Sequence, residues 1–184
     1  MRAFFRHHRA IVLFVAKMLA AYAVWFALYD LWLLPDGRLD EALSLHVASA
    51  SRSLLVWLGY QASVFGRVVW MDGTAGIEVV NGCNGLAVIG LFLGFVLAFP
   101  GSARRRLVFL PLGILTLYLV NVGRLAFLVL VQQYRPEWFD LVHQFAATGI
   151  YYVVVFGLWA AWTHFGAAKG TARPETARMT AVRA

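Results

Sequence analysis

The stretch LVFLPLGILTLYLVNVGRLAFLVLV, residues Leu107 to Val131, decides the fold, because it is almost continuously apolar and carries one charge, Arg124. A run of about 20 apolar residues crosses the hydrocarbon core of a bilayer as a helix. The composition agrees, since 61% of the 184 residues are hydrophobic and only 14% are charged. The chain is therefore expected to be an all-α polytopic membrane protein.

The chain is also basic, with 16 Lys and Arg residues against 9 Asp and Glu. These basic residues lie mostly at the edges of apolar runs, which is typical of topology signals and of contacts with lipid head groups. We therefore expect the lipid bilayer, and not a nucleic acid, as a partner.

Three more apolar segments complete the prediction, Ile11–Leu34, Cys83–Phe99 and Phe145–Phe165. The first is too long for the core of a signal peptide and is expected to be an anchor. The second is short, but its 17 residues at roughly 1.5 Å each give about 25 Å. The sequence thus predicts four transmembrane helices.

These helices are expected to form a single membrane-embedded catalytic domain, residues 11–166, between a basic N-terminus, residues 1–10, and a basic, disordered tail, residues 167–184. With four spans, both termini and the triplet Arg104–Arg106 fall on the same side of the membrane. The positive-inside rule makes that side cytoplasmic. The remaining loops carry more acidic residues and are expected to face the periplasm or the exterior.

Residues 39–61 have apolar side chains at helical spacing, interrupted by His46 and Arg52. This pattern predicts an amphipathic helix on the outer face of the membrane. The alternative is an additional span, which would bury Arg52. The following segment GRVVWMDGTAGIEVV, residues 66–80, alternates and contains glycine turns, so it predicts a short extended or hairpin segment that leads to Cys83.

Cys83 is the only cysteine, which excludes an intramolecular disulfide and a metal site built from cysteines alone. It is expected to open the second span, where the free N–H groups of a helix N-terminus stabilise a thiolate and make it nucleophilic. The neighbouring Asn84 and Gly85 are expected to support the site, with backbone N–H groups close to the sulfur. A buried structural cysteine is the alternative.

Arg124 lies inside an apolar helix, where an unpaired charge costs roughly 2.5–3.5 kcal/mol on insertion scales. Asn121, three residues earlier, is expected on the same helical face.

His143 precedes the last span at the same outer level as Cys83 and Arg124. A thiol, an imidazole and a guanidinium at one depth indicate a cysteine-nucleophile site, with no metal or cofactor. His46 is a weaker candidate for the base, and snorkelling of Arg124 to the head groups is the alternative to a functional role.

Four features follow one another along the chain: NGCNGL around Cys83, FP at the end of the short span, NVGR ending at Arg124, and His143 before the last span. In this order they resemble the exosortase/archaeosortase family. The resemblance covers about Ile77 to Trp162 and is closest to the small single-module members, such as the exosortase H group. It implies a membrane cysteine protease or transpeptidase, a hydrolase in which Cys83 is the nucleophile, Arg124 the catalytic arginine and His143 the acid–base group.

The resemblance also implies membrane-anchored protein substrates that end in a short motif, an apolar helix and a basic tail. Their sorting signal would be cleaved at the periplasmic face of the bacterial inner membrane, through a thioacyl-enzyme. This intermediate would pass its acyl group to water, to an amine, or to a polysaccharide or lipid-linked acceptor. The alternative function is a non-catalytic membrane scaffold, or an accessory subunit of an envelope polysaccharide export system.

Overall fold

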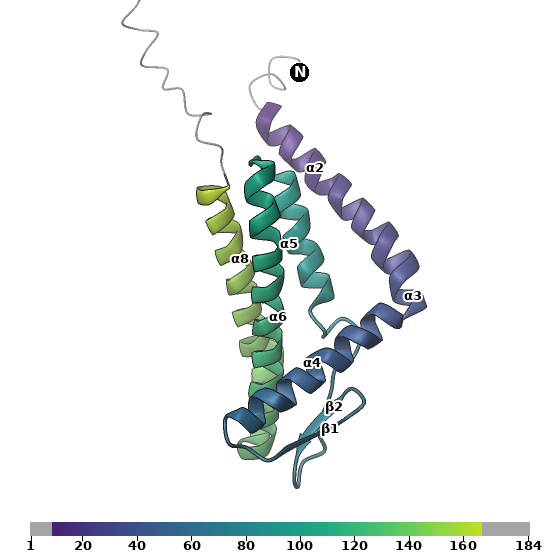
Figure 1. Cartoon of the computed structure of the whole chain (residues 1–184), viewed down its shortest axis with the longest axis vertical. Helices are drawn as coiled ribbons and strands as arrows, with labels where there is room; N and C mark the ends of the chain where they lie inside the picture. Colours follow the sequence, from purple (N-terminus) through teal and green to yellow (C-terminus); the bar gives the residue numbers. More distant parts are fainter. Residues whose placement is uncertain (1–8, 167–184) are drawn as a thin grey trace, which may run out of the picture.

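A computed structural model describes residues 9–166 of the chain (Figure 1). The predicted N-terminal segment 1–10 lies mostly outside these residues, and the predicted tail 167–184 lies wholly outside them. The described part is mostly helical, at 77%. Its helices are α2 (Arg9–Trp25), a π-helix (Phe26–Leu33), α3 (Leu34–Asp36), α4 (Arg38–Trp57), α5 (Leu86–Ala98), α6 (Ala103–Tyr134), a 3-10 turn (Pro136–Trp138), α7 (Phe139–Leu141), a second π-helix (Val142–Ala146) and α8 (Ala147–Phe165).

Three helical segments in the described part are long and apolar enough to cross a membrane: Ile11–Asp36, Ala103–Tyr134 and Pro136–Phe165. They coincide with three of the four predicted spans, so the prediction of a multi-pass membrane protein is confirmed. An apolar 18-residue stretch within Ile11–Asp36 has none of its residues buried inside the protein, whereas Tyr29 in the same segment is buried. A lipid environment accounts for this exposure, because acyl chains solvate apolar side chains that water would not.

The fourth predicted span, Cys83–Phe99, is not confirmed as a span. Its helix, α5, has 13 residues, or about 20 Å, and begins at Leu86. The expectation that Cys83 opens this helix was therefore wrong. Gly85 precedes the helix with a left-handed φ of 92°, and the Asn84 side chain accepts a hydrogen bond from the Leu86 N–H at 3.0 Å. These two residues delay the start of the helix and leave Cys83 in the preceding loop.

Helix α4 has one buried face, as predicted for residues 39–61, and is not among the segments that could cross a membrane. In Figure 1 it crosses the lower part of α6 obliquely, and the two helices are in contact. The Ser51 hydroxyl donates to the carbonyl oxygen of Val122 at 3.1 Å. The buried residues follow helical spacing along one stripe, namely Asp40, Ser44, Val47, Ala48, Ser51 and Leu55.

The predicted hairpin between α4 and Cys83 is confirmed as a small antiparallel sheet of order β1-β2-β3. β1 (Ala62–Phe65) pairs with β2 (Val68–Met71) across the two-residue turn that begins at Gly66, whose φ is 57°. β2 pairs in turn with β3 (Ile77–Glu78), which leads directly into the cysteine loop. The fold is thus helical with one small sheet beside the candidate site.

The buried apolar side chains form two clusters along α6. The first joins α4 and the sheet to the second half of α6, through residues such as Val47, Val69 and Leu125. The second joins α5 and α8 to the first half of α6, through residues such as Phe92 and Leu117. Asn121 lies four residues after Leu117 and four before Leu125, so the same face of α6 presents a buried amide between the two clusters.

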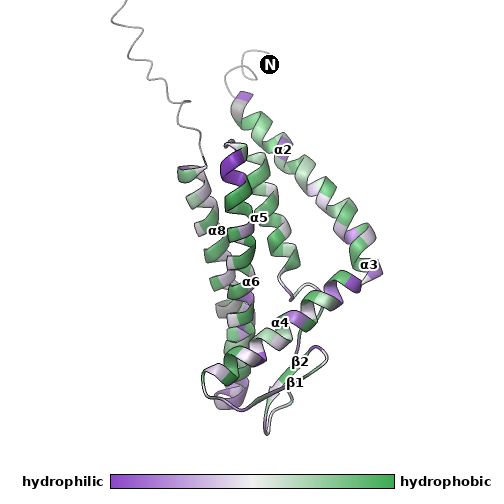
Figure 2. Ribbon diagram, in the orientation of Figure 1, coloured by the Kyte–Doolittle hydropathy of each residue, from purple (hydrophilic) through white to green (hydrophobic). Residues whose placement is uncertain are grey.

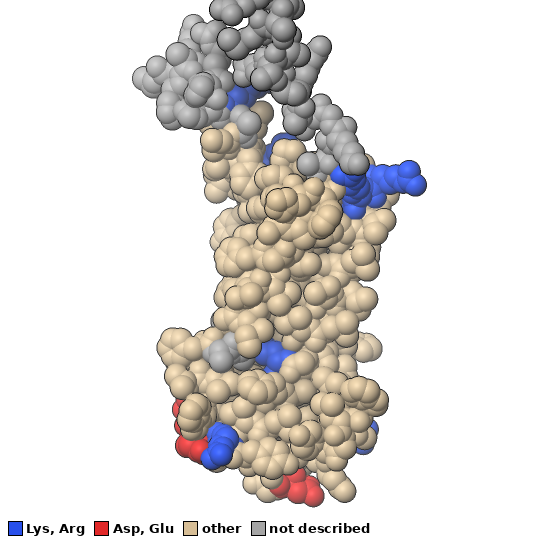
Figure 3. All heavy atoms as spheres, turned by 90° about the vertical axis from the view of Figure 1, so that its left-hand side faces the viewer, with Lys and Arg blue, Asp and Glu red and all other residues tan. Residues whose placement is uncertain are grey.

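The two ends of the molecule differ in charge. On the face shown in Figure 3, Asp and Glu lie only at the lower end, whereas Lys and Arg lie at both ends and also within the largely uncharged belt between them. The upper end, where no acidic side chain is seen, is called the basic end. Figure 2 shows the strongly hydrophilic first turn of α6 next to hydrophobic helix. The Ser102 N–H donates to the Gly166 carbonyl oxygen at 3.2 Å, and Phe14 packs on Phe99, so the beginnings of α2 and α6 and the end of α8 meet at the basic end.

Candidate active site

Cys83 lies in a tight loop between β3 and α5, and its side chain is half-buried. The Cys83 N–H donates to the Val80 carbonyl oxygen at 3.0 Å, which closes a turn. Gly82 and Gly85 flank this turn with φ values of 85° and 92°. Residues with side chains rarely adopt such angles, so the two glycines of the NGCNGL motif fix the path of the loop.

Gly85 is also required by its surroundings. A Cβ at this position would lie 2.6 Å from the Tyr151 hydroxyl and 3.4 Å from the Asn121 amide nitrogen. By contrast, a Cβ at Gly82 would meet nothing within 4 Å. The loop can therefore approach α6 and α8 closely only because position 85 carries no side chain.

Two side chains of α6 bind the backbone of the cysteine. Asn121 Nδ2 and Arg124 Nη2 donate to the Cys83 carbonyl oxygen at 3.1 and 3.2 Å. Arg124 Nε donates in addition to Asn121 Oδ1 at 3.2 Å, so the predicted contact between these two residues is confirmed. The Arg124 guanidinium also lies 5.9 Å from the centre of the Tyr151 ring. The intramembrane charge is thus partnered, and its partners hold the loop of the only cysteine.

The structure brings Cys83, Arg124 and His143 together around one small cavity of about 30 Å³. They reach it from the loop before α5, from α6 and from the π-helix before α8. The His143 ring is exposed and stacks on Phe139, with 5.7 Å between the ring centres. The remaining wall comes from β3, α4 and α6, through Val47, Ile77, Glu78, Val79, Leu125 and Leu128.

The other predicted residues do not line this cavity. Asn121, Asn84 and Gly85 are buried behind it, where they position the loop. His46 lies on the exposed side of α4, away from the cavity wall. Of the two histidines considered as the base, only His143 is placed beside Cys83 and Arg124.

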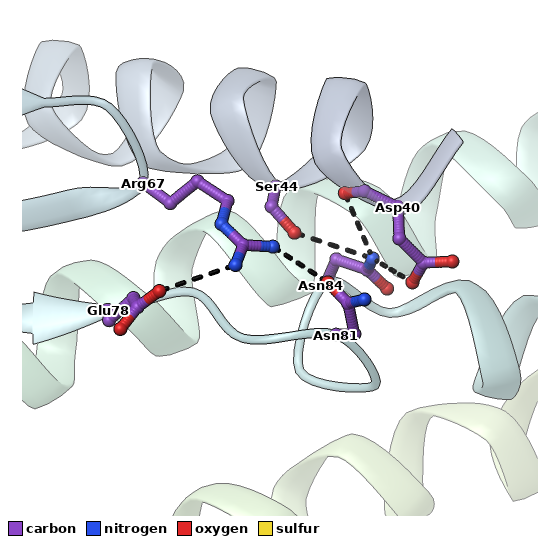
Figure 4. A network of polar contacts seen from close by, with 6 residues as sticks. All are labelled: Asp40, Ser44, Arg67, Glu78, Asn81 and Asn84. Atoms are coloured by element: carbon purple, nitrogen blue, oxygen red, sulfur yellow. Dashed lines mark hydrogen bonds and ion pairs between the residues drawn. The ribbon is translucent and has the colours of Figure 1, made fainter. Parts of the chain in front are cut away.

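Asp40 is a residue that sequence reasoning missed. It is fully buried, and its Oδ1 accepts hydrogen bonds from Asn84 Nδ2 at 2.7 Å and from the Tyr29 hydroxyl at 2.9 Å. Figure 4 shows the Asn84 side chain pointing away from its loop toward Asp40 and Ser44 of α4. The residue next to the cysteine is therefore anchored to α4, and through Asp40 it is linked to Tyr29 of the first π-helix.

Arg67 forms a second anchor on the exposed side of the loop. Its Nη1 donates to Asn81 Oδ1 at 2.7 Å, and its Nη2 donates to Glu78 Oε1 at 3.3 Å (Figure 4). Because Arg67 lies in the β1–β2 turn, the sheet is tied to the loop at the residue that begins the NGCNGL motif. Both ends of the loop are thus held by side chains from other elements.

Together, the fold and the site define a multi-pass membrane protein with a rigid cysteine loop, an arginine and a histidine at one cavity. A family model described as transmembrane exosortase (Exosortase_EpsH) matches residues 5–160. This match covers most of the chain, so the protein belongs to the transmembrane exosortase family, as its motifs predicted. No curated protein and no solved structure matches the chain in the corresponding comparisons.

Proposed function

We propose that the protein is a membrane cysteine peptidase or transpeptidase that cleaves C-terminal sorting signals of exported proteins, with Cys83 as nucleophile. The observation that carries this proposal is the single cavity lined by Cys83, Arg124 and His143, which come from three separate parts of the chain. Family membership supports it independently, because exosortases act on membrane-associated substrates.

The reaction proceeds in two halves. His143 takes the thiol proton while the Cys83 sulfur attacks the scissile carbonyl carbon, and the negative charge moves to the carbonyl oxygen. The C–N bond then breaks, and His143 returns the proton to the leaving amine. The resulting thioester at Cys83 is attacked by water or by an acceptor that bears an amine or hydroxyl, which restores the thiol.

The developing oxyanion needs hydrogen-bond donors that are fixed before the reaction. Arg124 is already oriented by Asn121 and by the Cys83 carbonyl oxygen, and within residues 9–166 its Nη1 donates to no acceptor. The N–H groups of Asn84 and Gly85 likewise have no acceptor among these residues. Arg124 lines the cavity together with Cys83, so we assign the oxyanion to its guanidinium, whereas the Asn84 and Gly85 N–H groups lie behind the cavity wall.

The cavity is small, since about 30 Å³ holds little more than one water molecule. A peptide substrate therefore displaces part of its wall on binding. His143 lies on the exposed side of that wall, in a π-helix, a form that is common at functional sites. We assign the opening to this side, where a substrate held in the bilayer by its own apolar helix reaches the site.

We further propose that the basic end of the molecule faces the cytoplasm and that the cysteine cavity faces the periplasm of a bacterial inner membrane. The arginine triplet Arg104–Arg106 in the first turn of α6 supports this orientation. The cysteine loop is level with Asn121 on α6, which continues for 13 further residues to Tyr134. The cavity therefore lies toward the C-terminal end of α6, away from the arginine triplet in its first turn.

The direct test is co-expression with a membrane-anchored protein of the same genome that ends in a short motif, an apolar helix and an arginine cluster. Trimming of its tail is followed by immunoblot. Cys83→Ala is expected to abolish trimming, while the matched His46→Ala leaves it intact. If the Cys83→Ala protein accumulates normally in the membrane and still trims the tail, the peptidase assignment is wrong, and a scaffold or export-accessory role takes its place.

A further inference from the structure

A cavity of about 680 Å³ lies between the start of α6 and the end of α8, at the basic end of the molecule. It shares no residue with the cavity at Cys83. Its wall combines three side chains that donate hydrogen bonds or carry positive charge with apolar side chains below them. The polar set is Arg104, Arg105 and His164, and the apolar set includes Val108, Leu112 and Phe165.

The three consecutive arginines do different things. Arg106 turns toward α5, where its Nε and Nη2 donate to the carbonyl oxygens of Val96 and Phe99 at 3.3 and 2.9 Å. It thereby satisfies carbonyls that the end of a helix leaves unpaired. Arg105 Nη1 donates to the Phe165 carbonyl oxygen at 2.6 Å and so ties the two walls of the cavity together.

Arg104 makes no contact of this kind. It is exposed, and within residues 9–166 its side chain makes no hydrogen bond or ion pair. The eight acidic residues of this range all fall between Asp30 and Glu78 or between Glu137 and Asp140, and none of them lines the cavity. The positive charge at the rim of this cavity is therefore not neutralised by a carboxylate of the described chain.

We propose that this cavity binds an anionic phospholipid, with its phosphate at Arg104 and His164 and the start of an acyl chain against Val108, Leu112 and Phe165. In a bilayer the first turn of α6 lies where the hydrophilic surface meets the apolar belt, which is the level of lipid phosphates (Figure 2). Basic pockets between membrane helices are the sites that recognise acidic head groups. The inference needs the chain to be embedded in a membrane, but it does not depend on the proposed catalytic activity.

The experiment measures lipid retention by the full-length protein in detergent, using native mass spectrometry. The probe is dioleoyl phosphatidylglycerol, compared with the zwitterionic dioleoyl phosphatidylcholine. The double variant Arg104→Gln/His164→Gln is expected to bind phosphatidylglycerol at least about tenfold more weakly than the wild type. The matched control is Arg135→Gln, which removes an exposed arginine, paired with Glu137 at 3.9 Å, beyond the other end of α6.

Two further arms identify the ligand. Phosphatidylcholine is expected to bind the wild type no better than it binds the double variant. A large excess of sn-glycerol 3-phosphate is expected to leave bound phosphatidylglycerol in place, because the apolar wall contributes to binding. Equal affinity of the wild type and the double variant, equal binding of the two lipids, or displacement by the soluble phosphate would each overturn the proposal. Because both altered side chains are exposed, the variants are expected to fold, which circular dichroism checks.

Discussion

Arg124 holds the cysteine loop by its backbone, since Arg124 Nη2 donates to the Cys83 carbonyl oxygen at 3.2 Å. The same guanidinium is held within α6 by Asn121 through Nε, and Asn121 Nδ2 donates to the same Cys83 carbonyl oxygen, so two side chains of α6 hold one point of the loop. The Arg124 side chain therefore supports the loop and also lines the cavity that Cys83 and His143 share.

Arg124→Lys is expected to reduce processing by about a hundredfold or more. The three N–H groups of a lysine ammonium share one nitrogen, whereas the planar guanidinium spreads its donors over three. The ammonium therefore cannot make both hydrogen bonds, to Asn121 and to the Cys83 carbonyl oxygen, and also direct a donor at the oxyanion. The measurement is the rate of substrate trimming at equal protein level. Arg52→Lys is the matched control, because Arg52 does not line the cavity and, within residues 9–166, makes one hydrogen bond, from Nε to the Ala62 carbonyl oxygen. An unimpaired Arg124→Lys protein would contradict the role given to the guanidinium.

Asp40 is expected to act as a positioning residue through Asn84. Asp40→Leu removes the closest acceptor of the buried Asn84 amide and the acceptor of the Tyr29 hydroxyl, leaving Asn84 only two longer bonds, and should destabilise the fold by about 1–3 kcal/mol. Asp40→Asn keeps one oxygen to accept from both Asn84 and Tyr29, and should therefore retain folding and most processing.

The effect of Asp40 is measured by thermal unfolding in detergent together with the rate at which a maleimide alkylates Cys83 in the folded protein. In Asp40→Leu the loop is released, so the alkylation rate should change along with the unfolding temperature. An Asp40→Leu protein with wild-type stability, alkylation and processing would show that the network does not position the loop.

Orientation is tested with fusions to a phosphatase that is active only outside the cytoplasm. A fusion after residue 184 should be inactive, and one inserted near Asp72, beyond the end of β2, should be active. The reverse pattern would place the cysteine cavity on the cytoplasmic side and overturn the proposed substrate class with it.

Much of the fold could be predicted because it depends on local patterns. Long apolar runs identified the three helices that are long and apolar enough to cross a membrane, and helical spacing identified the buried stripe of α4. The contact between Asn121 and Arg124 followed from their separation of three residues in a helix. Likewise, the placement of Cys83, Arg124 and His143 at a common level anticipated the cavity that they share.

What the sequence did not reveal depends on contacts between distant residues. Asp40 looks like part of the polar face of an amphipathic helix, and only its partners Tyr29 and Asn84, 11 and 44 residues away, make it a buried acceptor. The start of α5 was misplaced for a related reason. Hydropathy continues through Cys83, but the Asn84 side chain and the left-handed Gly85 hold the chain out of the helix until Leu86.

The central claim is that Cys83 carries the substrate as a thioester, and the most direct measurement is the mass of the protein isolated during turnover. The account predicts an adduct at Cys83 whose added mass is that of the N-terminal cleavage product less one water, removed by neutral hydroxylamine. The adduct should be absent from Cys83→Ala, and it should form far more slowly in His143→Ala, because His143 takes the thiol proton and protonates the leaving amine in the first half of the reaction. Cleavage of the substrate by the wild type with no adduct on Cys83, or by Cys83→Ala, would contradict the account.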